Sequence, residues 1–392
     1  MRFPHSPAGG AAGGAEPILA ERARELADRV ARPTAAARDR ERRWDPAVFA
    51  ALADPTTGPG LAGPLVPRAL GGGGLSATQT CALLEGLGEG ARDPGLALAV
   101  GVHAVLATVP LRAFGDPRQR RHYLPRMASG EWTGALSLRQ TQGAALTPTV
   151  TARPDPAKRG GWLLAGELDL VAGAPVAHHF LVIAAHPDGS RTAFVVDRTT
   201  PALTVQDTGP TAMATCPWGR LVLDDSPVPD HAVLGTTGAA ATQTEPLLAA
   251  LDWVFSSAPW LGAIRALTRD AIGDARERHL FGRPLAHGQS TRFTLADLGT
   301  RYELAAGLLY RAAGQFDAGG HPSQQDAAAA RLFTAQAART VTQAAADLSG
   351  PLPPAGDHLT ERAHRDALFF AGTGGGTEVL RPVIAASLLG LG

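Results

Sequence analysis

Cysteine is nearly absent from this chain, because its 392 residues include only Cys81 and Cys216. The two lie far apart and outside any CxxC or Cys/His spacing. We therefore expect neither a disulfide framework nor a metal site. An excess of charge is absent as well, since Lys plus Arg and Asp plus Glu each total 36. Without a field of one sign, neither nucleic acid nor a membrane surface is an expected partner.

Long hydrophobic runs are also missing, as no segment approaches the ~20 apolar residues that cross a bilayer. Residues 1–16 are rich in glycine, alanine and proline and lack the apolar centre of a signal peptide. HExxH, Ser-His-Asp and dinucleotide-binding signatures are not found, and the glycine-rich run at 371–376 lacks the lysine of a phosphate loop. These absences predict a cytoplasmic protein with a flexible N-terminus over residues 1–16.

What the sequence does contain is a change of hydrophobic period along the chain. A content of 45% hydrophobic residues supports a sizeable core divided into two or three domains. Helical spacing up to residue 114 gives way to short β-like runs between 133 and 233. Helices are predicted again over 247–278, 291–315, 323–348 and 379–389. We therefore expect a helical domain over 17–129, a β domain over 130–240 and a four-helix bundle over 241–392.

Three motifs indicate a family. Residues 276–285 read Arg-Glu-Arg-His-Leu-Phe-Gly-Arg-Pro-Leu, and further segments run from Phe114 to Trp132 and from Leu221 to Gly235. Together they resemble the acyl-CoA dehydrogenase superfamily. The resemblance implies an α+β fold with an N-terminal helical domain, a central β-barrel domain and a C-terminal four-helix bundle, assembled as a homodimer or homotetramer. It also implies FAD as cofactor and an acyl thioester, on CoA or a carrier protein, as substrate.

The family's general base is a carboxylate that must lie close to the substrate. Members commonly place a glutamate eight residues after the Asp of an Arg-Asp-Ala motif. Here that motif is 365–367, and the position is Gly374. Relatives resembling isovaleryl-CoA dehydrogenase supply the base from the first bundle helix instead, and the corresponding residue here is Asp252. Asp252 is our candidate base, with a structural role near the helix dipole as the alternative.

The segments that contact the flavin in this family are altered in this chain. The family pattern Leu-Thr-Glu-Pro-Gly-Ala-Gly-Ser becomes residues 138–145, Trp-Ile-Thr becomes residues 170–172, and Asp347 replaces a common glutamine. Each lost hydrogen bond costs about 0.5–1.5 kcal/mol, so we predict weak FAD binding. Three residues still match positions that hold FAD across the subunit interface in relatives: Arg278, Phe281 and Gln289.

Two further residues are candidates for the catalytic site. Arg139 replaces a flavin-facing threonine and could hold a carboxylate or an oxyanion, the alternative being a salt-bridged surface arginine. His179 could act as a catalytic imidazole, the alternative being a solvated histidine at the start of a strand. The cleft near these residues is predicted to hold a bulkier substrate or to be narrowed by inward movement of the Arg139 segment. Its predicted borders are Arg139, Leu170, His179, Asp252 and Gly374.

Three functions remain open at this point. The first is a divergent enzyme of bacterial specialised metabolism that acts on an acyl thioester or a related carbonyl compound, with standard α,β-dehydrogenation lost or altered. The second is an active FAD-dependent acyl-CoA dehydrogenase that uses Asp252 as its base. The third is a catalytically silent subunit that pairs with an active homologue.

Overall fold

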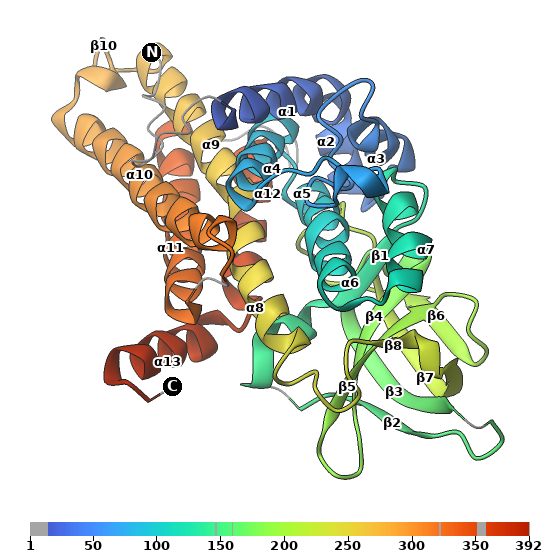
Figure 1. The fold of residues 1–392 in the computed structure, drawn as a ribbon. Coiled ribbons are helices and arrows are strands. Elements are labelled where there is room, and N and C mark those ends of the chain that lie inside the picture. Colours follow the sequence, from blue (N-terminus) through green and yellow to red (C-terminus); the bar gives the residue numbers. More distant parts are fainter. Residues whose placement is uncertain (1–14, 146, 159, 321–322, 351–357, 392) are drawn as a thin grey trace.

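The computed structural model describes residues 15–145, 147–158, 160–320, 323–350 and 358–391. Its first part is helical and packs beside the long helices of the last part, while the strands form a separate layer at one end of the molecule (Figure 1). The helices of the first part are α1 (Glu16–Val30), α2 (Ala35–Glu41), α3 (Pro46–Ala53), α4 (Ala77–Ala91), α5 (Pro94–Gly101), α6 (Thr108–Phe114) and α7 (Pro117–Ala128). Of the predicted flexible segment, residues 1–14 lie outside the described residues, and Glu16 already begins α1.

Glycines let helix α4 pack backbone to backbone against two neighbours. A Cβ on Gly86 would lie 2.1 Å from the carbonyl oxygen of Ala20 in α1. On the other side of α4, a Cβ on Gly88 would lie 2.0 Å from the carbonyl oxygen of Pro259. Real Cβ atoms do not approach so closely, because interiors are packed to crystal-like density. The spacing of these glycines therefore fixes α4 between the N-terminal helix and the last helical region.

The β domain is one sheet whose two faces serve different cores. Its strands are β1 (Gly134–Ser137), β2 (Val150–Pro154), β3 (Gly161–Ala172), β4 (His179–Ala185), β5 (Arg191–Asp197), β6 (Leu203–Asp207), β7 (Trp218–Pro229) and β8 (Val233–Leu234). Within the described residues they follow the order β6-β7-β3-β1-β4-β5-β8, and β2 pairs with β3 and β4. Alternation along β4 puts Phe180 and Val182 in the core of the domain, whereas Leu181 and Ile183 join the helical core.

The last region contains six helices within the described residues, whereas the sequence predicted four. Its helices are α8 (Thr244–Phe255), α9 (Ala258–Glu277), α10 (Gln289–Asp317), α11 (Gln324–Ser349), α12 (Leu359–Gly372) and α13 (Gly376–Leu389). The predicted 247–278 helix is divided after Phe255, because Pro259 has no N–H to donate to that residue. The prediction missed α12, although Leu359, Ala363, Ala367 and Phe370 form a buried stripe at helical spacing.

Two helical stretches are more apolar than the sequence analysis allowed. By length and composition, Pro94–Phe114 and Thr244–Glu277 could each cross a membrane. However, 89% and 94% of their most apolar windows are buried inside the protein. They are core helices of this fold, and their apolar character comes from facing other helices on nearly every side.

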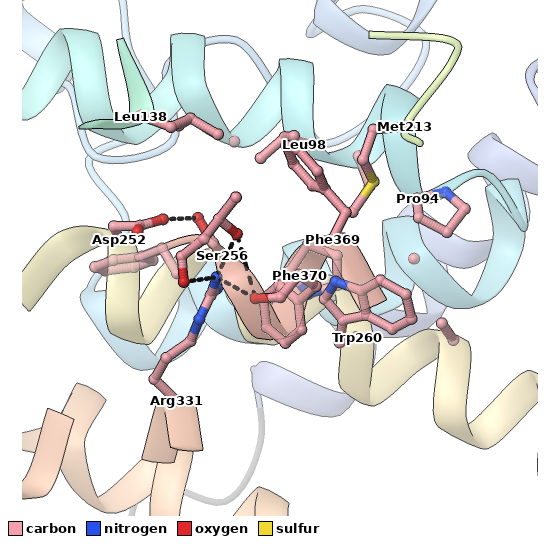
Figure 2. Close-up of a pocket in the computed structure, with 17 residues that line it drawn as sticks. Pro94, Leu98, Leu138, Met213, Asp252, Ser256, Trp260, Arg331, Phe369 and Phe370 are labelled. Atoms are coloured by element: carbon pink, nitrogen blue, oxygen red, sulfur yellow. Dashed lines mark hydrogen bonds between the residues drawn. The ribbon is translucent and has the colours of Figure 1, made fainter. Parts of the chain in front are cut away.

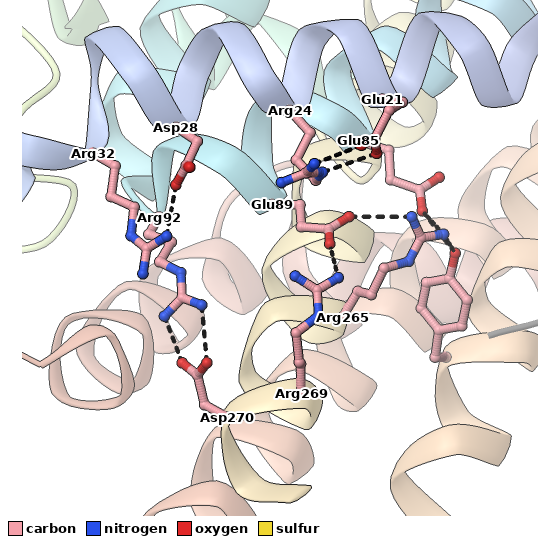
Figure 3. Close-up of polar contacts among 11 residues, drawn as sticks. Glu21, Arg24, Asp28, Arg32, Glu85, Glu89, Arg92, Arg265, Arg269 and Asp270 are labelled. Atoms are coloured by element: carbon pink, nitrogen blue, oxygen red, sulfur yellow. Dashed lines mark hydrogen bonds and ion pairs between the residues drawn. The ribbon is translucent and has the colours of Figure 1, made fainter. Parts of the chain in front are cut away.

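A network of buried charges joins α4 to α9 and α10 (Figure 3). The hydroxyls of Tyr302 and Tyr310 donate to the two carboxylate oxygens of Glu85, at 2.7 and 2.6 Å. Arg265 of α9 lies 2.6 Å from Glu85 and 3.2 Å from Glu89. Burial of the phenol raises the pKa of Tyr302 well above its ordinary value. Because each buried carboxylate is paired with arginine, removing one partner would leave an uncompensated buried charge, and the network holds the two helical regions in register.

Candidate active site

A narrow apolar slot lies among α5, α8, α9 and α12, with one polar end (Figure 2). Its larger apolar side chains are Leu98, Leu138, Met213, Phe255, Trp260, Phe369 and Phe370. The polar end is made by Asp252, Ser256, Arg331 and Thr373. The cavity measures about 20 Å³, which is close to the space that one water needs. An acyl group would therefore have to separate these side chains as it enters.

Asp252 lies in α8 with only 3% of its surface exposed. The hydroxyl of Ser256, one turn further along the chain, donates to Asp252 Oδ1 at 2.6 Å. The Thr141 hydroxyl oxygen is 2.9 Å from Asp252 Oδ2 and 2.9 Å from the Leu138 carbonyl oxygen, so its single hydrogen can serve either acceptor. The carboxylate is thus positioned by neighbouring hydroxyls and belongs to the slot, as a general base requires.

The two positions at which the family places its base meet in this structure. A Cβ on Gly374 would lie 2.9 Å from Asp252 Oδ2. Gly374 also has a φ of +67°, a conformation that side chains rarely adopt. Its carbonyl oxygen accepts a 2.8 Å hydrogen bond from the indole of Trp253, the residue after Asp252. The chain thus places its carboxylate beside the turn that carries Gly374.

The segment that corresponds to the family's flavin-contacting loop fills the space beside Asp252. Residues Leu138–Ala145 form a 3-10 helix, η4, which packs on α8. Thr141 of η4 is fully buried, and Leu138 lines the slot. The Leu170 side chain, where the family has tryptophan, packs directly against the helical core. The space directly beside Asp252 is thus filled by η4, while a larger hollow is bordered by Arg139 and Gln140 of the same segment.

Arg139 lies on the other side of η4 from Asp252. Its Nε donates to Asp169 Oδ1 at 2.5 Å, and half of its side chain is exposed. With Gln140, Arg139 borders a second hollow of about 640 Å³ that shares none of its described residues with the slot. The predicted cleft is therefore divided by η4: it is filled near Asp252 and open near Arg139.

His179 lines neither the slot nor the second hollow among the described residues, and its catalytic role stays a prediction. His179 begins β4 and is 2% exposed, with its ring centroid 4.9 Å from that of Tyr123 in α7. Within the described part of the chain, neither ring nitrogen has a hydrogen-bond partner. Alternation along β4 directs His179 toward the helices, but its side chain packs against α7 and not against α8, which carries Asp252. The solvated alternative is contradicted, because the side chain is buried.

The buried histidines predict that the protein loses stability in acid. Burial lowers the pKa of His179 to about 3 and that of His103 to about 4. In the unfolded chain both histidines take up a proton as pH falls through 6.5, whereas in the folded chain they do so only at pH 3 to 4. Each histidine should therefore lower the free energy of unfolding by about 1.4 kcal/mol per pH unit below 6.5. Burial raises the pKa of Asp366 to about 6, so the folded chain takes up this proton before the unfolded chain does. Between about pH 6 and 4 this carboxyl group therefore offsets the loss of stability caused by one of the two histidines.

Chemical denaturation at pH 7, 6 and 5 checks this expectation. His179→Phe should flatten the loss of stability between pH 6.5 and 5, because it removes one of the two groups. The matched control is His231→Gln, since His231 is exposed and should leave the pH dependence unchanged. An unchanged slope in His179→Phe would show that this histidine does not titrate differently in the fold.

The three residues that match interfacial FAD contacts lie on or beside a short hairpin, whose strand β10 is at the opposite end of the molecule from the β domain (Figure 1). Arg278 precedes the hairpin of β9 (His279–Leu280) and β10 (Arg283–Pro284) and donates to the Leu348 carbonyl oxygen at 3.1 Å. Phe281 at its tip is 95% exposed, and Gln289 begins α10 in an exposed position. Their predicted role across a subunit interface stays a prediction, because it involves a second chain.

The Arg-Asp-Ala motif holds the fold together near the slot. Asp366 accepts a 2.7 Å hydrogen bond from the backbone N–H of Met213, a residue that lines the slot. Arg365 pairs with both carboxylate oxygens of Asp39 in α2. The motif thus fixes α12 against the first helical part and the 208–217 segment.

Across the described residues, no group of three or more His, Cys, Asp or Glu side chains could hold a metal ion.

Arg331 is the site residue that the sequence analysis missed. It belongs to α11 and is 1% exposed, although arginine is rarely buried so deeply. Its Nη2 donates to the Phe370 carbonyl oxygen at 2.8 Å and to Thr373 Oγ1 at 2.9 Å. The only signal in the sequence is its place within an alanine-rich helical stripe, where a small residue is expected.

Comparisons with known proteins agree with this architecture. Residues 15–131 match the family described as "Acyl-CoA dehydrogenase, N-terminal domain", and residues 255–389 match "Acyl-CoA dehydrogenase, C-terminal domain". The benzylmalonyl-CoA dehydrogenase of Aromatoleum aromaticum is 29% identical over 91% of this chain and 93% of its own. The L-prolyl-[peptidyl-carrier protein] dehydrogenase of Pseudomonas fluorescens is 28% identical over 71% of this chain and 74% of its own.

Solved structures share the same fold over nearly the whole chain. Butyryl-CoA dehydrogenase from Megasphaera elsdenii superposes with a TM-score of 0.88 at 24% identity, covering 97% of this chain and all (100%) of that one. The prolyl acyl carrier protein oxidase AnaB gives a TM-score of 0.87 at 24% identity, covering 96% and 100%. The predicted order of helical, β and helical regions is confirmed, and the chain belongs to the acyl-CoA dehydrogenase family.

Proposed function

We propose that this chain acts on an acyl thioester by removing and returning a proton at the α-carbon, with standard α,β-dehydrogenation lost or altered. The observation that carries the proposal is the buried Asp252 carboxylate at the polar end of an apolar slot. The apolar walls suit an acyl chain, and the polar end suits its carbonyl group. The names of the relatives support a thioester of CoA or of a carrier protein as the substrate class.

The proposed step balances without an oxidant. Asp252 accepts the α-proton, the electron pair of the C–H bond moves into the carbon skeleton, and the thioester oxygen carries the resulting enolate charge. Return of a proton from Asp252 to the same carbon regenerates the thioester. In D₂O the carboxyl group exchanges with solvent between turnovers, so deuterium replaces hydrogen at the α-carbon.

The altered flavin-contacting segments at 138–145 and 170–172 support the loss or alteration of dehydrogenation. Thr141 and Leu138 of η4 occupy the space beside Asp252, and Arg139 is held away from it by Asp169.

We further propose that the chain forms a homodimer or homotetramer, since Phe281 and neighbouring apolar side chains at the hairpin are exposed. The cytoplasm is the proposed location. The expected setting is bacterial specialised metabolism.

Two measurements on the purified protein test the proposed function. The visible absorption spectrum should show little flavin, and added FAD should be lost on gel filtration. Mass spectrometry of butyryl-CoA incubated with the protein in D₂O should show deuterium at the α-carbon. Stoichiometric flavin that butyryl-CoA reduces would instead support the FAD-dependent dehydrogenase, and loss of that reduction in Asp252→Asn would support Asp252 as its base.

A catalytically silent subunit is the second candidate function, and the narrowness of the slot favours it. A cavity of about 20 Å³ holds no acyl chain without rearrangement. This candidate predicts neither deuterium exchange nor flavin, together with stable co-purification with an active homologue. Exchange by the isolated chain would exclude it.

A further inference from the structure

A buried cation with unused hydrogen-bond donors faces the candidate base. Arg331 Nε and Nη1 are buried, and within the described residues they have no hydrogen-bond partner. Among the described residues, no carboxylate oxygen forms a direct ion pair with Arg331, and the nearby Asp252 carboxylate favours its charged form. Burying two arginine N–H groups without acceptors is costly, so they point to a ligand that completes the contacts of the guanidinium.

The third nitrogen fixes the direction of the guanidinium. Nη2 donates to the Phe370 carbonyl oxygen and to Thr373 Oγ1, and the guanidinium carbon lies 3.6 Å from the Phe370 ring centroid. Figure 2 shows the side chain rising from α11 toward the polar end of the slot, between Phe370 and the residues around Asp252. The arginine is therefore held rigidly, as preorganised electrostatic stabilisation requires.

Asp252 and Arg331 face the same space above Gly374. A Cβ on Gly374 would lie 2.9 Å from Asp252 Oδ2 and 3.4 Å from both Nε and Nη2 of Arg331. The missing side chain brings a proton acceptor and a hydrogen-bond donor close together, and because even a Cβ there would crowd Asp252, a substrate atom enters between them only when these groups move apart. A carbonyl compound needs this pair of groups for enolisation, one at the α-carbon and one at the oxygen.

We propose that Arg331 binds the carbonyl oxygen of the thioester and stabilises the enolate oxyanion while Asp252 holds the α-proton. This inference rests on the proposed function and names a second catalytic residue for it. Burial lowers the pKa of Arg331 to about 10, which still leaves the guanidinium charged at neutral pH. A charged donor in a dry site stabilises developing negative charge more strongly than the same donor in water.

Substitution of Arg331 tests the proposal with two readouts. Arg331→Met keeps most of the volume and removes the donors, so we expect α-deuterium exchange into butyryl-CoA to fall about 10²–10³-fold. Arg331→Lys keeps the cation and should retain more activity than Arg331→Met. The infrared carbonyl band of bound ¹³C-labelled butyryl-CoA should be shifted to lower frequency by the native protein and not by Arg331→Met. A purely structural arginine would not move that band.

The outcomes separate this inference from the proposed function. Exchange and a shifted band in the native protein that persist unchanged in a folded Arg331→Met variant would overturn the role of Arg331 alone. Absence of exchange in the native protein would overturn the proposed function and this inference with it. If Arg331→Met does not fold, the comparison of native protein with Arg331→Lys decides: an unshifted band in the native protein refutes carbonyl binding, and a shift weakened in Arg331→Lys supports it.

Discussion

Replacement of Asp252 by asparagine should cut α-deuterium exchange into an acyl thioester by about 10²–10⁴-fold. The change keeps the shape of the side chain but removes the proton acceptor. The melting temperature should change little, because the amide oxygen can still accept the hydrogen of Ser256. Mass spectrometry of butyryl-CoA after incubation in D₂O measures the rate.

The matched control is Asp270→Asn. This carboxylate lies in α9 and pairs with Arg92, outside the described lining of the slot. Its loss should leave the exchange rate unchanged. Equal exchange rates in the native protein and in Asp252→Asn would return Asp252 to the structural alternative, a carboxylate held by nearby hydroxyls.

Gly86→Ala should destabilise the protein by about 3 kcal/mol or more, at the upper end of the cost of overpacking. The new methyl group would lie 2.1 Å from the backbone oxygen of Ala20, so α1 and α4 must move apart. The gain in helix propensity, about 1 kcal/mol, is too small to compensate. The midpoint of guanidinium denaturation measures the effect.

Gly273→Ala is the control for this prediction. Gly273 also lies inside a helix, α9, but a Cβ there meets no atom within 4 Å. Alanine should therefore be neutral or stabilise by up to about 1 kcal/mol. Similar midpoints for Gly86→Ala and Gly273→Ala would mean that α1 does not pack on α4 as closely as described.

The broad fold and the location of Asp252 were accessible from the sequence because both depend on regular spacing. Helical and strand periods separate the regions, and an uninterrupted count from the Arg278 motif places Asp252 in the first helix of the last region. The structure adds that Asp252 lies beside Gly374, which the count did not show.

The contents of the site were less accessible because they depend on contacts between distant segments. The contact of His179 with α7 could not be predicted from the strand, because alternation gives the face of β4 but not which helix covers that end. The inward packing of η4 depends on contacts between Thr141 and α8, more than 100 residues further along the chain. Arg331 carries no motif, and only its burial distinguishes it from a surface arginine.

The position of η4 sets a thermodynamic condition for any ligand that needs the space of Thr141. Such a ligand binds only the fraction of molecules in which η4 has moved aside. Its apparent dissociation constant is the intrinsic one divided by that fraction, so an open population of about 1% weakens binding about 100-fold. Substitutions in η4 that favour the open form would therefore raise affinity without touching the ligand, and the same eight residues would control how readily the slot admits a substrate.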